Sequence, residues 1–397
     1  MKNYLTKLSN YSNLSLSILI LIGIYFSFTG GYGSDEDTLA LIGAYESMMG
    51  GEKVMASRFT PYPVAEIGIG FLSYQFGSFS ANFVTFLFIV FGSLFFYLSL
   101  SKKNDFENIP LFLVLCLSNP TLFFDNIEPI DYSWAFVFFS LALYSLKKKY
   151  YELAALFFGI SIGTRINFVL FVFVVIFYID YIKQFNLFKR IILFLTSFFI
   201  GGLFYLTIWY QHGFGLEWLT AVTPNNQGLF GLISRFIYKT ILSITFLSFL
   251  FLVFNFLKII KENKIYKIFK IENINLLLGI ILFNLILFIF IPAEISYLQP
   301  FLISFYFIIF KLFNKKIIVF LIILNLSSWF IDINFLKIRY KSNNFCNNVE
   351  AISAEFDLKF ESGKLYKYIK SRDQIKCWVL DNSKRSQKIL NGKALKD

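Results

Sequence analysis

The segment GGYGSDED at residues 30–37 decides the fold, because a long apolar run first gives way to a polar one there. An apolar run over about residues 14–28 precedes it, and the loop that it opens continues to about residue 77. A membrane span requires roughly 20 apolar residues. The run before residue 30 therefore predicts a first membrane helix, and residues 30–79 predict a large first loop outside the bilayer.

The composition extends this interpretation to the whole chain. The 397 residues are 57% hydrophobic and 21% aromatic, with a mean hydropathy of +0.63, whereas soluble domains average about 45–50% apolar. The apolar residues form long uninterrupted runs, which excludes the alternating pattern of half-buried strands. The chain is predicted to be an all-α polytopic membrane protein. The first apolar run, with Lys2 and Lys7 before it, resembles a signal peptide. No small-residue cleavage pattern follows it, so we expect an uncleaved first helix.

Runs of suitable length predict about eleven membrane helices in a domain covering residues 1–332. They cover about 14–29, 80–100, 109–124, 132–146, 150–164, 166–182, 191–210, 236–257, 275–291, a segment ending near 310, and 317–332. The net charge of +12 comes from lysine clusters between these runs. The clusters all lie on one side if the N-terminus is cytoplasmic, as the positive-inside rule requires. We therefore expect a multi-pass protein of the cytoplasmic membrane, with its polar loops and its tail outside.

The tail, residues 333–397, predicts a small extracytoplasmic α/β appendage. Residues 361–371 predict a short helix, and residues 376–380 predict a short strand that ends in a turn. A disulfide between Cys346 and Cys377 is one expectation in an oxidising compartment, and two free thiols are the other. The single histidine, His212, excludes a multi-histidine metal centre.

The first loop carries the first group of candidate site residues. Asp35, Glu36 and Asp37 follow the first membrane helix directly. Ser34 and these acids could serve only to begin a helix, since a cap and acids in the first turn stabilise its N-terminus. Three acids exceed that need, so we expect at least one to be functional. Residues 64–76 predict an amphipathic helix in the membrane interface, with Glu66 either functional or facing water.

Four cations on the predicted outer side break the charge rule and are candidates for binding phosphate: Arg58, Arg165, Arg235 and Lys239. Arginine presents a planar set of donors that suits phosphate. Arg235 and Lys239 are four residues apart, so they share one helix face. The alternatives for each are an ion pair with a nearby acid, or a side chain that extends to the membrane surface.

A second acidic group lies between the third and fourth predicted spans, at Asp125, Glu128 and Asp131. It could approach the first group, and two such groups could hold a divalent cation through carboxylate oxygens. Asp131 could instead only cap the following helix. Weaker candidates on the same predicted side are His212, Glu294 and Tyr297. The sequence lacks a Walker-type phosphate loop and a Gly-x-Ser-x-Gly elbow, which argues against ATPases and serine hydrolases.

In their order along the chain, five short stretches resemble the GT-C superfamily of integral-membrane glycosyltransferases. The resemblance is strongest to the protein O-mannosyltransferase and lipid A aminoarabinose transferase type. It covers about residues 14–310 and lies in Ser34–Asp37, 57–63, 127–132, 163–165 and 295–300.

The resemblance implies inverting transfer of a sugar from a polyprenyl-phosphate donor to an extracytoplasmic acceptor, which is a glycan, lipid or protein. It implies that Asp35, or else Glu36, is the catalytic base, and that the four cations bind the donor phosphate. No cofactor is required with certainty, and a divalent metal cation is possible. A transporter or flippase for a lipid-linked saccharide is the main alternative. A polysaccharide polymerase is less consistent with the sequence, because the long loop comes first in the chain. A structural membrane protein is the remaining class.

Overall fold

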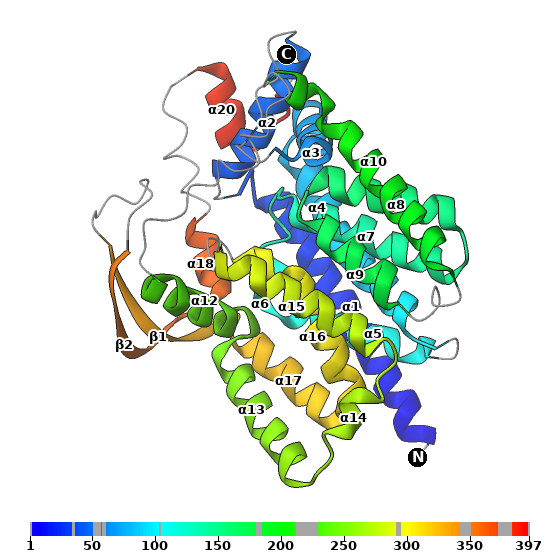
Figure 1. Cartoon of the computed structure of the whole chain (residues 1–397). Helices are drawn as coiled ribbons and strands as arrows, with labels where there is room; N and C mark the ends of the chain where they lie inside the picture. Colours follow the sequence, from blue (N-terminus) through cyan, green and yellow to red (C-terminus); the bar gives the residue numbers. More distant parts are fainter. Residues whose placement is uncertain are drawn as a thin grey trace. The chain divides into compact units, whose positions relative to one another are not determined.

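The structure, a computed structural model, describes most of the chain. The described residues are 2–33, 36–50, 57, 61–102, 105–179, 185–211, 229–290, 295–340, 351–371 and 383–395. They form helices throughout, with one two-stranded antiparallel sheet (Figure 1). Four of the described helical segments are long and apolar enough to cross a membrane: Asn10–Thr29, Ser78–Leu100, Leu187–Tyr210 and Ile295–Leu312. A bent pair raises the number to five.

These elements fit an all-α membrane protein with a small sheet. The total of about eleven spans stays a prediction, since several of the expected spans correspond to apolar helices of only 10–17 residues. They are Phe106–Ser118, Tyr151–Thr164, Phe168–Tyr178 and Ile274–Ile289.

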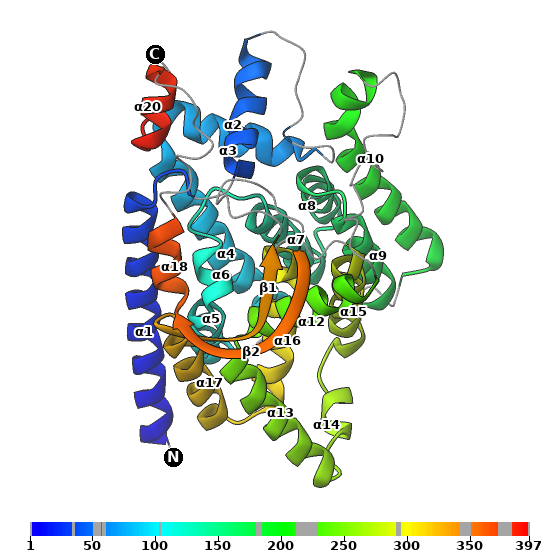
Figure 2. The same ribbon diagram turned by 90° about the vertical axis from the view of Figure 1, so that its left-hand side faces the viewer.

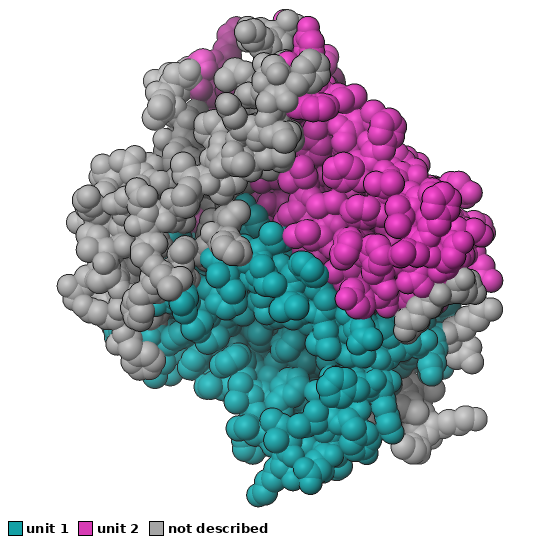
Figure 3. Space-filling model, in the orientation of Figure 1, with its two compact units in different colours: residues 1–21, 101–125, 224–370 teal, residues 22–100, 126–223, 371–397 magenta. Residues whose placement is uncertain are grey.

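The chain forms two compact units, each assembled from separate stretches (Figure 3). Unit 1 contains residues 1–21, 101–125 and 224–370, and unit 2 contains residues 22–100, 126–223 and 371–397. The first helix, α1 (Lys2–Thr29), contributes residues to both.

Unit 1 contains most of the C-terminal half of the chain. Its elements after α1 are η1 (Phe106–Asn108), α5 (Ile109–Ser118), α6 (Pro120–Phe124), α12 (Leu229–Ile244), α13 (Phe246–Lys261), α14 (Tyr266–Phe269), α15 (Ile274–Phe290), η3 (Ile295–Leu298), α16 (Gln299–Leu312), α17 (Lys315–Ser327), β1 (Ile331–Tyr340), β2 (Ala351–Ser362) and α18 (Lys364–Ser371). Buried amides connect them: Asn119 donates to the Tyr306 hydroxyl at 2.8 Å, and Ser248 donates to Asn325 at 2.7 Å. Such bonds are needed where water is absent, because an unsatisfied polar group is costly there.

Two predicted spans of unit 1 are broken. The expected helix over 109–124 divides at Asn119, because Pro120 has no N–H to continue the α5 bonding pattern. The expectation of a single helix over 236–257 is wrong. Helices α12 and α13 meet at an angle of 88°, and Thr245 between them has a φ of 72° (Figure 1).

The tail of unit 1 differs in part from the prediction. The helix expected over 361–371 is confirmed as α18, whereas the strand expected over 376–380 lies outside the described residues. The eleventh predicted span ends early: α17 stops at Ser327, and β1 begins at Ile331. Strands β1 and β2 form a curved antiparallel ribbon (Figure 2). The boundary expected at residue 332 therefore falls inside a strand.

Unit 2 contains the first loop and the helices that support it. Its elements after α1 are α2 (Glu36–Met49), α3 (Pro63–Phe76), α4 (Ser78–Leu100), α7 (Tyr132–Lys147), α8 (Tyr151–Thr164), α9 (Phe168–Tyr178), α10 (Leu187–Gln211) and α20 (Lys384–Leu390). The helices predicted after Ser34 and over 64–76 are confirmed as α2 and α3. Glycines allow α8 and α10 to approach closely, since a Cβ at Gly159 or Gly163 would overlap Ile200 or Phe204.

The C-terminal segment of unit 2 packs on the first loop. Ile389 and Leu395 join Tyr32 and Ile42 in one buried cluster. The Tyr32 hydroxyl donates to the Lys393 carbonyl at 2.8 Å, and burial raises the pKa of this tyrosine well above its usual value. The end of the tail therefore packs against the start of the first loop.

Candidate functional site

Unit 2 contains a buried group of charged and aromatic side chains that we call the Arg165 cluster. It consists of Glu66, Asp131 and Arg165 with Tyr62 and Tyr132. Three segments supply them: the start of α3 with the residue before it, the start of α7 with the residue before it, and the residue after α8. The cluster therefore depends on the tertiary packing of unit 2.

Arg165 follows the last residue of α8 and adopts an extended backbone conformation. Its side chain is only 2% exposed, and its Nη1 lies 3.2 Å from Oδ2 of Asp131, which is fully buried. The guanidinium carbon lies 3.9 Å from the ring centroid of Tyr132 and 4.8 Å from that of Tyr62. Two aromatic faces and one carboxylate thus stabilise a cation that would be costly to bury alone.

Asp131 occupies the N-cap position of α7, but its side chain accepts no capping hydrogen bond. The hypothesis that Asp131 serves only as a helix cap is therefore wrong. The ion-pair alternative for Arg165 is present in the structure, with Asp131 as the partner.

Glu66 is fully buried, so the alternative in which it faces water is wrong. Its Oε1 accepts hydrogen bonds from the backbone N–H of Ser57 at 2.9 Å and of Tyr62 at 3.2 Å, and from the Ser57 hydroxyl. Burial raises the pKa of Glu66, the three hydrogen bonds partly lower it, and the charge of Asp131 raises it further. The hydrogen bonds of Glu66 therefore hold the segment that precedes α3 in place. Its burial favours the protonated form of the carboxyl group.

Two carboxylate oxygens of the cluster, Oε2 of Glu66 and Oδ1 of Asp131, lack a hydrogen-bond partner among the described residues. Buried polar atoms are usually satisfied, so these oxygens suit a proton, a water molecule or a polar ligand. A carboxyl with a raised pKa holds its proton more tightly than usual and can serve as a proton donor, and a fixed guanidinium can stabilise an anion. The cluster thus has the groups for acid–base chemistry beside an anion.

Glu128 also lies in unit 2, where it contacts the first loop. Gly33 has a φ of +82°, and a Cβ built there would lie 2.8 Å from Oε2 of Glu128. Gly33 precedes Asp35 by two residues in the chain. The second acidic segment therefore contacts the first loop at Gly33; its expected approach to the first acidic group stays a prediction, because Asp35 lies outside the described residues.

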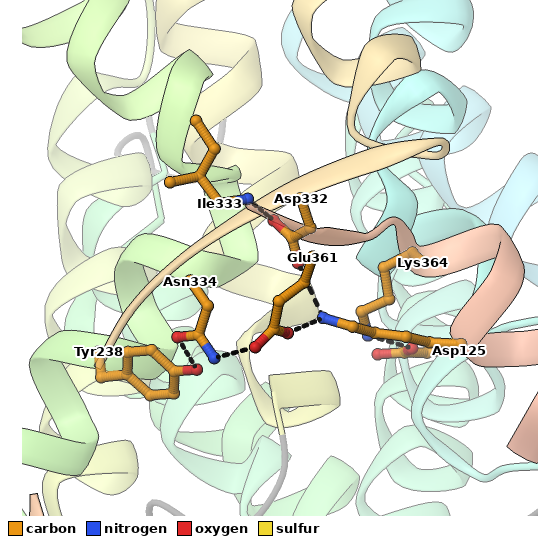
Figure 4. Close-up of polar contacts among 8 residues, drawn as sticks. Asp125, Tyr238, Asp332, Ile333, Asn334, Glu361 and Lys364 are labelled. Carbon is orange, nitrogen blue, oxygen red and sulfur yellow. Dashed lines mark hydrogen bonds and ion pairs between the residues drawn. The ribbon is translucent and has the colours of Figure 1, made fainter. Parts of the chain in front are cut away.

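Asp125 belongs to unit 1 and has a different set of partners (Figure 4). Its Oδ2 accepts a hydrogen bond from Ser296 at 2.8 Å, and its Oδ1 lies 3.5 Å from Nζ of Lys364. The hypothesis of one cluster of Asp125, Glu128 and Asp131 finds no support in these contacts. Among the described residues, no group of three or more His, Cys, Asp or Glu side chains is arranged to hold a metal ion.

A network of polar side chains in unit 1 connects α12, the strands β1 and β2, and α18 (Figure 4). Tyr238 donates to Asn334 at 2.8 Å, and Asn334 donates to Glu361 at 3.1 Å. Lys367 then pairs with Glu361 at 3.0 Å and with Asp332 at 3.4 Å. We call this group the Lys367 network; its charged side chains are 14–41% exposed.

The remaining predicted residues divide into two sets. Arg235 and Lys239 lie half-buried on α12, as expected for neighbours on one helix face, and Tyr297 lies in η3. Outside the described residues lie Asp35, Arg58, His212 and Glu294, and also the side chain of Glu36, whose backbone begins α2.

Ser57, Tyr62 and Tyr132 lie in the stretches 57–63 and 127–132, but sequence reasoning assigned none of them a role. Tyr132 adjoins Asp131, and Tyr62 stands four residues before Glu66 between two prolines. Aromatic residues beside candidate charges were the available signal, but a chain with 23 tyrosines and 54 phenylalanines makes that signal weak.

Comparison with known proteins adds no assignment, because no protein-family model, curated protein or solved structure matches this chain.

Proposed function

We propose that this chain is an inverting membrane glycosyltransferase of the GT-C type. It would move a sugar from a polyprenyl-phosphate donor to a glycan, lipid or protein acceptor outside the cytoplasmic membrane. The observation that carries the proposal is the Arg165 cluster, in which Arg165 and Asp131 converge with Glu66 of the first loop. The contact between Glu128 and Gly33 supports it, because that contact lies two residues from Asp35 in the chain.

The proposed reaction is a single displacement at the anomeric carbon. The acceptor hydroxyl attacks that carbon, the bond from the sugar to the phosphate oxygen breaks, and polyprenyl phosphate leaves with the bonding electrons. A carboxylate takes the hydroxyl proton, and Asp35 is our first choice, with Glu36 second. Fixed positive charge stabilises the departing phosphate, for which Arg58, Arg165, Arg235 and Lys239 are the candidates.

Within this proposal, Glu66 and Asp131 have supporting roles. Glu66 binds Ser57, the residue before Arg58, and so restrains the backbone beside that arginine. Asp131 orients Arg165 and balances its charge until a phosphate arrives. Both roles require a water-poor site, where charge interactions are strong.

The topology completes the proposal. About eleven spans with a cytoplasmic N-terminus would place the first loop, the loop at 125–131 and the tail on the outer face of the cell envelope. The lysine clusters between the apolar runs support that orientation.

The test is sugar transfer by the purified chain from polyprenyl-phosphate sugars. Asp35→Asn should abolish transfer in a protein that still folds. Arg58→Ala should weaken use of the donor. Normal transfer by Asp35→Asn would refute the assigned base, and the same measurement on Glu36→Gln would follow.

One observation favours the alternative of a transporter or flippase for a lipid-linked saccharide. Such proteins bind substrates at interrupted membrane helices, and α12–α13 and α5–α6 are both interrupted. The two functions differ in their product. A transferase breaks the bond between sugar and phosphate, whereas a flippase moves the intact lipid-linked sugar across the bilayer.

A further inference from the structure

The bend between α12 and α13 provides an observation that the proposed function does not use. The helices meet at 88°, and Thr245 joins them with a φ of 72°, which a β-branched residue rarely adopts. The last carbonyls of α12 have no helical partner, and the Asn119 side chain donates to one of them, Ser243, at 2.8 Å. The buried Asn119 side chain thus provides a hydrogen-bond donor to a carbonyl at the bend. The bend is therefore part of the packed structure of unit 1.

Helix α13 has the surface of a membrane-facing helix. Phe254 is 70% exposed and Leu257 is 57% exposed, and lysines follow at 258 and 261 in the last turn. Its 16 residues give a length of about 24 Å at 1.5 Å per residue. This is shorter than the hydrocarbon thickness of roughly 30 Å, but the lysines of the last turn can extend to the membrane surface, which allows α13 to run across most of the apolar layer. A helix at 88° to it then lies close to the membrane plane.

Helix α12 has two chemically different faces. Successive residues turn by about 100°, so Ile233 and Ile237 stand on one face, while Arg235 and Lys239 stand on nearly the opposite one. The two isoleucines are 43% and 49% exposed. An exposed apolar stripe opposite a cationic stripe is typical of a helix in a membrane surface.

Contacts on its two flanks fix the rotation of α12. Tyr238 donates to Asn334 of β1 (Figure 4), and the Tyr238 ring lies 5.2 Å from that of Phe335. The Phe236 ring lies 6.0 Å from that of Phe288 in α15. These contacts hold the helix so that Ile233 and Ile237 remain on the outside of unit 1.

We propose that α12 is an interfacial lipid-binding helix. It lies in the plane of the bilayer surface, with Ile233 and Ile237 inserted among the upper acyl chains and with Arg235 and Lys239 on the water-facing side. The partner is the lipid surface itself. The 88° bend, the opposed faces of α12 and the exposed apolar residues of α13 carry this assignment, and it does not depend on the proposed activity.

Depth-dependent fluorescence quenching tests the assignment in the full chain. Cys116→Ala, Cys346→Ser and Cys377→Ser provide the background, and single cysteines for an environment-sensitive label enter by Ile237→Cys, Arg235→Cys and Phe254→Cys. The labelled proteins are reconstituted in phosphatidylcholine vesicles whose lipids carry bromine near the head end or near the methyl end of the acyl chain. Iodide serves as the aqueous quencher.

An interfacial helix is inserted only about 5–10 Å. The label at 237 should therefore be quenched more by head-end than by methyl-end bromine, with little quenching by iodide. The label at 254 should show the reverse bromine order, and iodide should reach the label at 235.

Two results would overturn the assignment. Strong iodide quenching at 237 without bromine quenching would make α12 a water-exposed surface. Methyl-end quenching at 237 equal to that at 254 would make α12 half of an interrupted membrane span. Ile233→Cys provides a second site with the same expectation if Ile237→Cys does not fold. Because no sugar transfer is measured, failure here is separable from failure of the proposed function.

Discussion

The Arg165 cluster of unit 2 and the Lys367 network of unit 1 join similar charges in different surroundings. Asp131 and Arg165 are at most 2% exposed, whereas Asp332 and Lys367 are 14% and 41% exposed. Water screens an exposed pair and restores the solvation of a charge that loses its partner, but it cannot do so for a buried charge. The comparison teaches that the charges of the Arg165 cluster are costly to bury and sensitive to the loss of a partner.

The largest effect is expected on breaking the buried pair. Asp131→Ala leaves the Arg165 guanidinium without its carboxylate, and loss of one buried partner typically costs about 3–5 kcal/mol. Asp332→Ala in the Lys367 network is the matched control, with an expected loss of about 1 kcal/mol or less. Denaturant unfolding in detergent measures both, and equal losses would remove the contrast between the two regions.

A second test examines the close contact between Gly33 and Glu128 in unit 2. Gly33→Ala places a methyl group against Glu128 at a φ of +82°, which an alanine tolerates poorly. We expect a loss of roughly 1–3 kcal/mol in the free energy of unfolding. Gly43→Ala is the control: this helical position has open space around it, so alanine should stabilise α2 by about 0.5–1 kcal/mol. A neutral Gly33→Ala would show that Glu128 and the first loop are not in close contact.

A third test uses pH. Burial raises the pKa of Glu66 above its usual value of 4.5, so the folded state holds this proton more tightly than the unfolded state. At a pH below the usual pKa, Glu66 is protonated in both the folded and the unfolded state, and its burial as a charge does not lower the free energy of unfolding. As the pH rises through the interval up to the raised pKa, the unfolded state loses its proton first and the free energy of unfolding falls.

Glu66→Gln keeps an acceptor for Ser57 and Tyr62 but does not ionise. It should therefore flatten this part of the pH profile of stability, and Glu361→Gln in the Lys367 network should not. If the free energy of unfolding of Glu66→Gln still fell by the same amount over this pH interval, a group other than Glu66 would be responsible for the pH dependence.

The smallest effect is expected at an exposed ion pair that also lies in unit 2. This pair tests whether burial, and not location in unit 2, sets the cost of losing a partner. Arg385 of α20 binds Glu46 of α2 at 2.6 Å, with side-chain exposures of 51% and 24%. Arg385→Ala should cost only about 0.2–1 kcal/mol and should matter less at high salt. The charge exchange Arg385→Glu with Glu46→Arg should recover most of the loss. A loss as large as that of Asp131→Ala would show that membership of unit 2, and not burial, sets the cost.

Most helices were predictable because a long apolar run leaves few alternatives. The expected spans over 80–100 and 191–210 match α4 and α10 closely. The break at Asn119 had a visible cause in Pro120, but the bend at Thr245 has neither proline nor glycine beside it. The hairpin was also missed, although Asp332, Asn334 and the apolar residues between them alternate as a strand does.

The candidate site was predictable in its residue types and not in its pairing. Asp125, Glu128 and Asp131 lie within seven residues, and nothing in their spacing favours one of them as the partner of Arg165. That choice depends on where α7 and α8 bring their ends, which tertiary packing decides. The burial of Glu66 was ambiguous for a similar reason, because a polar residue on a short apolar helix can face either side.

The most direct measurement of the central claim follows a radiolabelled sugar. The chain, reconstituted in vesicles, is supplied with a polyprenyl phosphate that carries the sugar and with cell-envelope acceptors. We predict that the label leaves the polyprenyl phosphate and joins an acceptor with inverted anomeric configuration, and that Asp35→Asn abolishes this. Label that crosses the bilayer while still attached to polyprenyl phosphate, with no transfer by the folded protein, would contradict the account.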